Sequence, residues 1–484
     1  MDGREFDGLF WSRRILWQTR WGFYSLGINE LCPLGAVLCV DDSPAYPAIS
    51  SPTGTRFLSL ESRTRWRSAD QESAIEEIVP TLGDDIVELL RESPQDWTAV
   101  AGNPSRAFVD FAQRTGIDCI SAPPLLCDWL NDKVNFLSAL SDLGLPQLSG
   151  RWLRLGDMTY AELKIEMGAS FVAQQPRGCT GSGTYFVGSA ADYERLAVNC
   201  GDALVRVAAD VGDLSLNINA IATEKGTAVG YPSVQLAGVP VLCSKRGQYC
   251  GNDYAATAGV EPRIVGSVVE QTQIIGQWLF SLGYHGLFGL DFVVESASNQ
   301  AYAVDLNPRW QGSTWLLGQT QFALGRFPLP VADIAYGMGL LSATELLRYS
   351  DHFLSPVSAS QFIVRSHESG WSKIGSTLEP GIYSFPDGVK QSRSSPPGSS
   401  EHRPSQHVTD LLDEGEFLIV GVPQPALLMS PGGHILRVCS RLPVYDLARA
   451  RLVPQAENAL HQLYVSLGLT PAEPPILDNS HRET

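Results

Sequence analysis

The stretch LFGLDFVVESASNQAYAVDLNPR constrains the fold more than any other part of the chain, because it joins two apolar runs through a short polar turn. Side chains alternate between the two faces of a β-strand. A symmetric turn pairs Glu295 with Ala301. Counting back along both strands then places Asp291 directly opposite Asp305, with Asn307 on the same face. The predicted hairpin has a polar face and an apolar face, the latter made of Leu290, Phe292, Val294, Tyr302, Val304 and Leu306.

Two carboxylates on one face of a hairpin need a counter-charge, since like charges placed directly opposite each other destabilise a strand pair. Asp291, Asp305 and Asn307 together offer hard oxygen ligands, which suit Mg²⁺ and are also acceptable to Mn²⁺. Mg²⁺ usually keeps several waters and takes further ligands from substrate phosphates. The sequence therefore predicts a metal site on this face. The alternative is an edge hairpin whose two aspartates are solvated.

A second polar stretch, FVAQQPRGCTGSGTYFVGS, places a loop rich in glycine and hydroxyl residues between two strand-like runs. Successive backbone N–H groups of such a loop can turn inward to hold an anion. A Walker A loop is excluded, because it needs a lysine directly before a helix. We expect a flexible hairpin flap over phosphates, with an ordinary glycine-rich turn as the alternative. The candidate flap residues are Gly178, Thr180, Gly181, Ser182, Gly183 and Thr184.

The remaining segments mix strand-like and helix-like patterns, which predicts an α+β or α/β fold class. Residues 1–130 read as an α/β domain, in which the strand DWTAVAG precedes a helix that Asn103 can cap. Residues 131–350 contain the flap and the hairpin. Residues 351–484 read as a β-rich C-terminal lobe, in which the segment 391–408 is rich in Ser, Pro and charge and is expected to be a mobile loop.

Composition narrows the class of partner. A formal charge of −17 and a pI near 4.9 argue against a broad nucleic-acid surface, which needs clustered Lys and Arg. No apolar run approaches the roughly 20 residues needed to span a bilayer, and the N-terminus lacks the order of a signal peptide. The nine cysteines show no C-x-x-C spacing. We expect a cytoplasmic protein with small-molecule or peptide substrates and neither nucleic-acid nor membrane partners.

The order of these parts resembles the ATP-grasp superfamily over roughly residues 90–350: an α/β segment, a glycine-rich flap, a helix, and a paired Asp…Asp-x-Asn-Pro-Arg hairpin. Within it the chain is most similar to the pheganomycin-type peptide ligases. The resemblance implies an ATP-grasp fold after a pre-ATP-grasp domain, ATP as co-substrate, and Mg²⁺ bridging the nucleotide phosphates. It also implies Arg309 as the catalytic residue beside the transferred phosphoryl group, and Lys133 as a nucleotide-binding lysine. A solvated Lys133 is the alternative.

One position departs from the family pattern. Members usually place a lysine just before the proline that leads into the flap, whereas this chain has Gln175 there. Glutamine can hydrogen-bond a phosphate but contributes no charge, so Arg177 or Lys133 would have to supply it. The predicted nucleotide-binding set is therefore Lys133, Gln175 and Arg177 together with the flap residues. No adenine ligand is predicted, since the adenine-binding hinge is not evident in the segment ALVRVAADVGDLSLN.

A basic segment, SKRGQYCGNDY, offers another candidate site. It brings Lys245, Arg246, Asn252 and Asp253 together in sequence, where they could meet a substrate carboxylate. An exposed, solvated loop is the alternative. His285 reads as structural, and no Ser-His-Asp or Cys-His arrangement is evident.

The resemblance implies an ATP-dependent carboxylate–amine ligase that forms an amide or peptide bond through an acyl phosphate and releases ADP and phosphate. Natural-product or amino-acid and peptide metabolism would be its setting. Two alternatives stay open. An ATP-grasp carboxylase is one, although the sequence has no biotin-carrier segment with a Met-Lys-Met motif. A non-catalytic nucleotide-binding module is the other, and Gln175 is its best argument.

Overall fold

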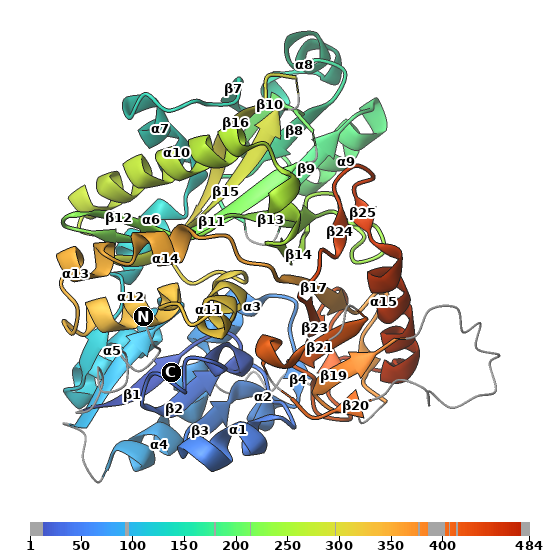
Figure 1. Ribbon diagram of the computed structural model, residues 1–484. Coiled ribbons are helices and arrows are strands. Elements are labelled where there is room, and N and C mark those ends of the chain that lie inside the picture. Colours follow the sequence, from blue (N-terminus) through green and yellow to red (C-terminus); the bar gives the residue numbers. More distant parts are fainter. Residues whose placement is uncertain are drawn as a thin grey trace. The chain divides into compact units, whose positions relative to one another are not determined.

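Two compact units make up the chain in the computed structural model (Figure 1). The residues described are 13–91, 96–178, 181–212, 214–295, 297–375, 378–385, 402–405, 407–412 and 415–475. Of these, unit 1 takes in Ile120–Phe362 and Arg441–Val453, and unit 2 takes in the rest. The mixed α/β fold class is confirmed, while the three-domain division remains a prediction. Most of the predicted mobile loop, 391–401 together with 406, lies outside the described residues.

Unit 2 contains a sheet in the order β3-β2-β1-β5-β6, in which β1 pairs in parallel with β2 and β5. Its strands are β1 Arg14–Gln18, β2 Leu34–Cys39, β3 Arg56–Ser59, β4 Trp66–Arg67, β5 Trp97–Ala101, β6 Asp118–Ile120, β18 Ser372–Lys373, β19 Gly381–Ser384, β20 His402–Arg403, β21 Glu416–Val420, β22 Leu428–Met429, β23 His434–Ser440 and β26 Thr470–Pro471. Its helices are α1 Tyr46–Thr53, α2 Leu60–Thr64, α3 Gln71–Glu76, α4 Ile78–Leu90, α5 Arg106–Thr115 and α15 Pro454–Leu467.

Helix α5 follows the predicted strand β5, but it begins later than expected. Its N-cap is Ser105, whose hydroxyl accepts a hydrogen bond from the Phe108 N–H, so the expectation that Asn103 caps it is wrong. Ser105 has the extended backbone that an N-cap requires, with φ −136° and ψ 132°. Phe108 and Ile86 of α4 then join one apolar core with Leu16 of the sheet.

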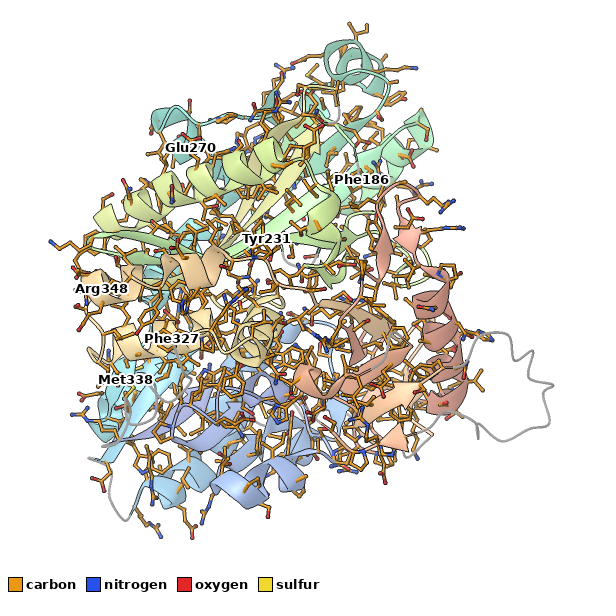
Figure 2. The ribbon with its side chains drawn as sticks, viewed as in Figure 1. Phe186, Tyr231, Glu270, Phe327, Met338 and Arg348 are labelled. Atoms are coloured by element: carbon orange, nitrogen blue, oxygen red, sulfur yellow. The ribbon has the colours of Figure 1, made fainter. Side chains whose placement is uncertain are left out.

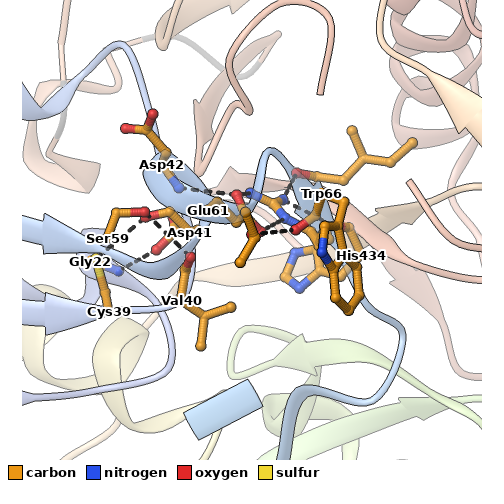
Figure 3. Close-up of polar contacts among 12 residues, drawn as sticks. Gly22, Cys39, Val40, Asp41, Asp42, Ser59, Glu61, Trp66 and His434 are labelled. Carbon is orange, nitrogen blue, oxygen red and sulfur yellow. Dashed lines mark hydrogen bonds and ion pairs between the residues drawn. The ribbon is translucent and has the colours of Figure 1, made fainter. Parts of the chain in front are cut away.

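A buried ion pair joins distant segments within unit 2. The Arg67 guanidinium contacts both Glu61 carboxylate oxygens, at 2.5 and 2.7 Å, and donates to the carbonyl oxygens of His434 and Ile435. Figure 3 shows Glu61 and His434 in this cluster. The neighbouring backbone also pairs, because β4 lies parallel to β22. Segments about 360 residues apart in sequence are thus held by one fully buried cation.

Unit 1 contains the strands β7-β10-β8-β9 of one sheet, the strands β16-β15-β11-β13-β14-β17 of another with β12 beside β11, and the two-stranded sheet β24-β25. Its strands are β7 Gly150–Arg154, β8 Phe171–Gln174, β9 Thr184–Val187, β10 Leu204–Ala209, β11 Ser215–Thr223, β12 Gly226–Val229, β13 Ser233–Ala237, β14 Tyr249–Asp253, β15 Gly286–Glu295, β16 Gln300–Asn307, the first half of β17 Ser360–Arg365, β24 Tyr445–Asp446 and β25 Arg451–Leu452. Its helices are α6 Pro124–Leu130, α7 Lys133–Asp142, α8 Tyr160–Met167, α9 Ala190–Cys200, α10 Pro262–Ser281, α11 Thr314–Ala323, α12 Leu329–Gly337, α13 Ala343–Leu347 and α14 Ser350–Leu354.

The long helix α10 lies across β11, β12 and β16 (Figure 1). Its buried side chains, among them Ile264, Val268 and Ile275, cover one face of these strands. The other face is therefore left to carry polar side chains. Among the described helices, none is both long and apolar enough to cross a membrane.

The hairpin β15–β16 has the predicted aspartate pairing but not the predicted turn. Asp291 lies opposite Asp305, as expected. Glu295 pairs with Gln300 instead of Ala301, and an irregularity between Asp291 and Phe292 restores the register, because a bulge sets two residues against one. Ser296, at the start of the predicted turn, lies outside the described residues.

The bulge changes which side chains reach the core. Ala301 and Ala303 are buried, whereas Tyr302 and Val304 are only partly buried. The Tyr302 hydroxyl instead donates to the Glu295 carboxylate at 3.3 Å. The prediction that Tyr302 and Val304 belong to the apolar face is therefore wrong beyond the bulge, while Leu290, Phe292, Val294 and Leu306 are buried as expected.

Candidate functional site

The polar face of the hairpin β15–β16 forms the centre of the candidate site. Asp291 and Asp305 are paired residues on adjacent strands, and Asn307 lies two residues further along the same strand. Burial, followed by the charge of Asp305, raises the pKa of Asp291 to about 6. The Asn217 amide opposes that shift by donating to Asp291 Oδ1 at 2.6 Å. Asp291 is therefore largely ionised at neutral pH, and the two carboxylates face each other as hard oxygen donors.

Lys133 supplies a cation to this carboxylate pair. It is the first residue of α7, whose N-cap Asp132 accepts from the Val134 N–H at 2.9 Å. Its Nζ lies 2.9 Å from Asp305 Oδ1, and only 7% of its side chain is exposed. The alternative of a solvated Lys133 is wrong, because burying a lysine is costly unless a partner balances its charge. Its nucleotide-binding role remains a prediction.

The donor set fits a hard divalent cation. Within the described part of the chain, no group of three or more His, Cys, Asp or Glu side chains is arranged to hold a metal ion. The hairpin offers two carboxylates and the Asn307 amide oxygen instead, and an octahedral ion completes such a set with water and phosphate oxygens. Lys133 already places one positive charge beside Asp305.

The predicted flap is a hairpin between β8 and β9, as expected. Gln174 pairs with Thr184, and the Gln175 N–H donates to the Gly183 carbonyl at 2.8 Å. Gly181 and Gly183 have φ of 85° and 75°, a left-handed conformation that glycine adopts without strain. Thr180 lies outside the described residues.

The base of the flap is attached to the start of helix α7. The Lys133 N–H donates to the Pro176 carbonyl at 2.9 Å, and Arg177 Nε lies 3.4 Å from the Asp132 carboxylate. A Cβ on Gly183 would lie 2.9 Å from Gln175 Oε1, so the glutamine side chain runs along the flap backbone. Lys133, Gln175 and Arg177 thus gather where the flap leaves the sheet, and the exposed Arg177 is the outermost of the three.

Arg309 follows the hairpin in a tight turn, in which its N–H donates to the Asn307 carbonyl at 2.8 Å. Its guanidinium Nη1 donates to the Trp310 carbonyl at 3.4 Å. Its positive charge slightly opposes the rise in the pKa of Asp291 that burial and the charge of Asp305 cause. The next residue is anchored, since Trp310 Nε1 donates to Asp333 at 2.9 Å. The turn therefore presents a guanidinium near the carboxylate pair.

A buried polar network hydrogen-bonds Asp291, and its residues were not among those predicted from the sequence. Asn217 of β11 donates to Gln311 Oε1 at 2.9 Å and accepts from the Ser313 hydroxyl at 2.6 Å. Asn219 donates to the same hydroxyl at 2.9 Å. Asn217 and Asn219 stand two apart in the apolar run LSLNINAIA, the same spacing that singled out Asp305 and Asn307. That pattern was the available signal.

The basic segment divides into an exposed loop and a buried strand. Arg246 lies in the loop and pairs with Asp210 at 2.7 Å, with its guanidinium carbon 4.2 Å from the centre of the Phe186 ring. Phe186 is labelled in Figure 2. Asn252 and Asp253 instead belong to β14 and are fully buried. Burial raises the pKa of Asp253 to about 6, although backbone N–H groups hydrogen-bond its carboxylate. Asn252 and Asp253 are therefore buried, which contradicts the prediction that they lie in a loop able to bind a substrate carboxylate.

No protein-family model and no curated protein matches this chain. Solved structures do. The biotin carboxylase domain of Hydrogenobacter thermophilus 2-oxoglutarate carboxylase, crystallised with MgADP, ADP and bicarbonate, is 12% identical with a TM-score of 0.55, over 89% of this chain and 86% of that chain. The L-amino acid ligase of Bacillus licheniformis is 11% identical with a TM-score of 0.52, over 95% of this chain and 99% of that chain. An ADP complex of N5-carboxyaminoimidazole ribonucleotide synthetase is 12% identical with a TM-score of 0.52, over 94% and 98%.

These matches extend over 89% to 95% of the chain. The chain has the ATP-grasp fold. At 11% to 12% identity the similarity concerns the ATP-grasp fold alone. The narrower likeness to pheganomycin-type ligases remains a prediction.

Proposed function

We propose that the chain is an ATP-dependent carboxylate–amine ligase, which activates a carboxylate as an acyl phosphate and joins it to an amine with release of ADP and phosphate. The observation that carries the proposal is the opposed pair Asp291 and Asp305, with Lys133 on one side and Arg309 following the hairpin. The ATP-grasp fold supports ATP as the co-substrate. The alternation of negative and positive groups suits a site that holds phosphates next to a substrate carboxylate.

Each residue has a role in this proposal. Asp291, Asp305 and Asn307 would hold Mg²⁺, or Mn²⁺, which supplies charge neutralisation to the bound nucleotide phosphates. Arg309 holds the incoming carboxylate and stabilises negative charge on the transferred phosphoryl group. Lys133, Gln175 and Arg177 bind phosphate oxygens at the base of the flap, together with Gly178, Thr180, Gly181, Ser182, Gly183 and Thr184 along the flap itself.

The flap protects the activated acid. An acyl phosphate is hydrolysed by water, so a site that makes one must exclude water while the amine attacks. Gly181 and Gly183 give the flap a backbone that can bend over phosphates without side chains between. Small-molecule or peptide substrates, a cytoplasmic location and the absence of nucleic-acid and membrane partners belong to the same proposal; the net charge of −17 supports the exclusion of nucleic acid.

Two other functions remain candidates, each with an observation in its favour. A carboxylase that phosphorylates bicarbonate is favoured by the likeness to a biotin carboxylase domain. A nucleotide-binding module without turnover is favoured by Gln175, which leaves the flap base without the family's lysine charge. The nucleotide product and the trapped acyl group separate these from the ligase.

The test is to incubate the protein with Mg-ATP and a panel of amino acids, peptides and other acids, with hydroxylamine in place of the amine. The ligase is supported by an acid-dependent hydroxamate formed together with ADP, and Asp305→Asn should lose both. AMP as the nucleotide product refutes the acyl-phosphate route. ADP that depends on bicarbonate and gives no hydroxamate favours the carboxylase, and bound ATP that is never turned over favours the binding module.

A further inference from the structure

Two cysteines outside the proposed site lie with their sulfurs side by side. Cys243 and Cys250 are buried, with relative exposures of 6% and 0%, and their Sγ atoms are 3.2 Å apart. Cys243 lies just before the exposed basic loop, and Cys250 is the second residue of β14. By contrast, the sulfurs of Cys39 and Cys127 hydrogen-bond backbone carbonyl groups rather than a second sulfur.

We infer that Cys243 and Cys250 are a redox modification site that closes reversibly into a disulfide. The sulfurs must approach by only about 1.2 Å to reach the length of an S–S bond. The seven-residue separation closes a small ring, and the residues 244–248 between Cys243 and the start of β14 at Tyr249 form bends and a turn outside any strand or helix. The chain needs a local adjustment of one loop and no rearrangement of the sheet.

The bond forms by two exchange steps with a low-molecular-weight disulfide such as oxidised glutathione. The thiolate of one cysteine attacks the reagent, and one glutathione thiolate leaves. The thiolate of the second cysteine then attacks the protein sulfur of this mixed disulfide and displaces the other glutathione. The two protons given up by the protein thiols end on the two glutathione thiols, and the reagent accepts the two electrons. A dithiol reverses both steps.

Access comes through the loop that separates the pair. Ser244, Lys245 and Arg246 are exposed, so the segment that directly follows Cys243 is in contact with solvent. Cys243 Sγ donates to the Val239 and Lys245 carbonyl groups, and Cys250 Sγ contacts the Gln248 carbonyl at 3.2 Å. These weak contacts are the ones that a brief opening of the loop breaks. Nearby lysine and arginine charges favour thiolate once the sulfurs are exposed.

The same loop packs against the flap. A Cβ on Gly181 would lie 2.6 Å from the Gly247 carbonyl oxygen, and a Cβ on Gly247 would lie 2.7 Å from the Phe186 ring. The backbones of Gly181 and Gly247 therefore lie in close contact, and the Arg246 guanidinium stacks on the Phe186 ring beside them. A disulfide restricts the loop to positions within the closed ring. Resting on the proposed function, we expect the oxidised protein to open its flap, and so to turn over ATP, at least about threefold more slowly.

Peptide mapping tests the modification directly. Trypsin separates the pair, because Lys245 and Arg246 lie between the cysteines: Cys243 falls in the peptide 226–245 and Cys250 in the peptide 247–263. The full chain is treated with oxidised glutathione, alkylated, digested without reductant and examined by mass spectrometry. We expect the two peptides linked, with two hydrogens lost, and released by dithiothreitol.

Single substitutions give the controls. Cys243→Ser and Cys250→Ser should each abolish the linked species, and either variant suffices if the other does not fold. Cys200→Ser removes a partly exposed cysteine elsewhere in unit 1 and should leave the linkage intact. The inference is overturned if both thiols stay alkylatable in the oxidised wild type, or if either cysteine links to a different cysteine.

The effect of the disulfide on the flap is tested separately, by measuring ATP turnover. Oxidised and reduced wild type are compared in the ADP assay, with oxidant-treated Cys243→Ser as the insensitive control. Slower turnover of the oxidised wild type alone supports the coupling. Linked peptides with unchanged turnover refute the coupling and leave the modification site standing. Linked peptides from a protein that turns over no substrate contradict the proposed function and not the site.

Discussion

Replacing Lys133 by Met should strengthen metal binding while it weakens catalysis. Lys133 Nζ lies 2.9 Å from Asp305 Oδ1, so the lysine and a metal ion compete for the same carboxylate. Even in a water-like dielectric, two charges at that distance attract by about 1.4 kcal/mol, which corresponds to about tenfold in a dissociation constant. The pair is shielded from water on the lysine side, with 7% of that side chain exposed against 28% for the aspartate. Tenfold is therefore a lower bound.

The assay uses Mn²⁺ in the absence of nucleotide, because its free and bound forms are counted by electron paramagnetic resonance. We expect Lys133→Met to bind Mn²⁺ at least about tenfold more tightly than the wild type, and to lose ATP turnover because the phosphates lose a cation. Lys225→Met, an exposed lysine in the turn between β11 and β12, is the matched control and should behave as wild type. Equal Mn²⁺ affinity in Lys133→Met and wild type would refute the reasoning.

Three further predictions concern the flap, a buried acid and the core of unit 2. Gly183→Val should reduce ATP turnover more than tenfold with a small change in thermal midpoint, because its φ of 75° disfavours any side chain and a Cβ meets Gln175 at 2.9 Å; unchanged kinetics would reduce the loop to an ordinary turn. Burial raises the pKa of Asp333 to about 6, so the folded state binds its proton more tightly than the unfolded state, and the stability this gives is complete below about pH 4 and lost as the pH rises through 6. Asp333→Asn should therefore stabilise the protein by about 3 kcal/mol above pH 7 and by almost nothing at pH 4, and a pH-independent difference in denaturant titrations would contradict this. Arg67→Met should cost about 3 to 5 kcal/mol of unfolding free energy by leaving Glu61 buried without its cation, and adding Glu61→Leu should restore part of it; a loss below 1 kcal/mol would show that the pair is not needed.

The sequence predicted the aspartate pair better than it predicted the hairpin that carries it. Asp291 opposite Asp305 followed from a turn counted one residue too long, and a bulge in the real strands offsets that error. Neither the shorter turn nor the bulge can be read from alternation, because both depend on how Ala301 and Ala303 pack in the core. Local sequence patterns therefore identified the polar face of the hairpin, whereas the exact pairing of its two strands depends on tertiary packing.

Contacts between distant segments were the part that could not be predicted. Lys133 was placed by family position, but its pairing with Asp305 joins residues 172 positions apart, which spacing cannot reveal. The link between Asn217 and Gln311 is of the same kind. The start of α5 shows a smaller failure: Asn103 and Ser105 are both good caps, and the geometry at Ser105 decides between them.

The bond between Arg67 and the carbonyl groups of His434 and Ile435 has a consequence for how the protein is made. During synthesis, the Arg67 guanidinium can pair with Glu61, but it lacks its two carbonyl acceptors until more than 360 further residues have left the ribosome. Unit 1 is mostly synthesised in between, so it can fold while unit 2 still lacks its C-terminal segments. A nascent chain stalled before residue 434 should therefore contain a protease-resistant unit 1 core beside an N-terminal segment that depends on chaperones.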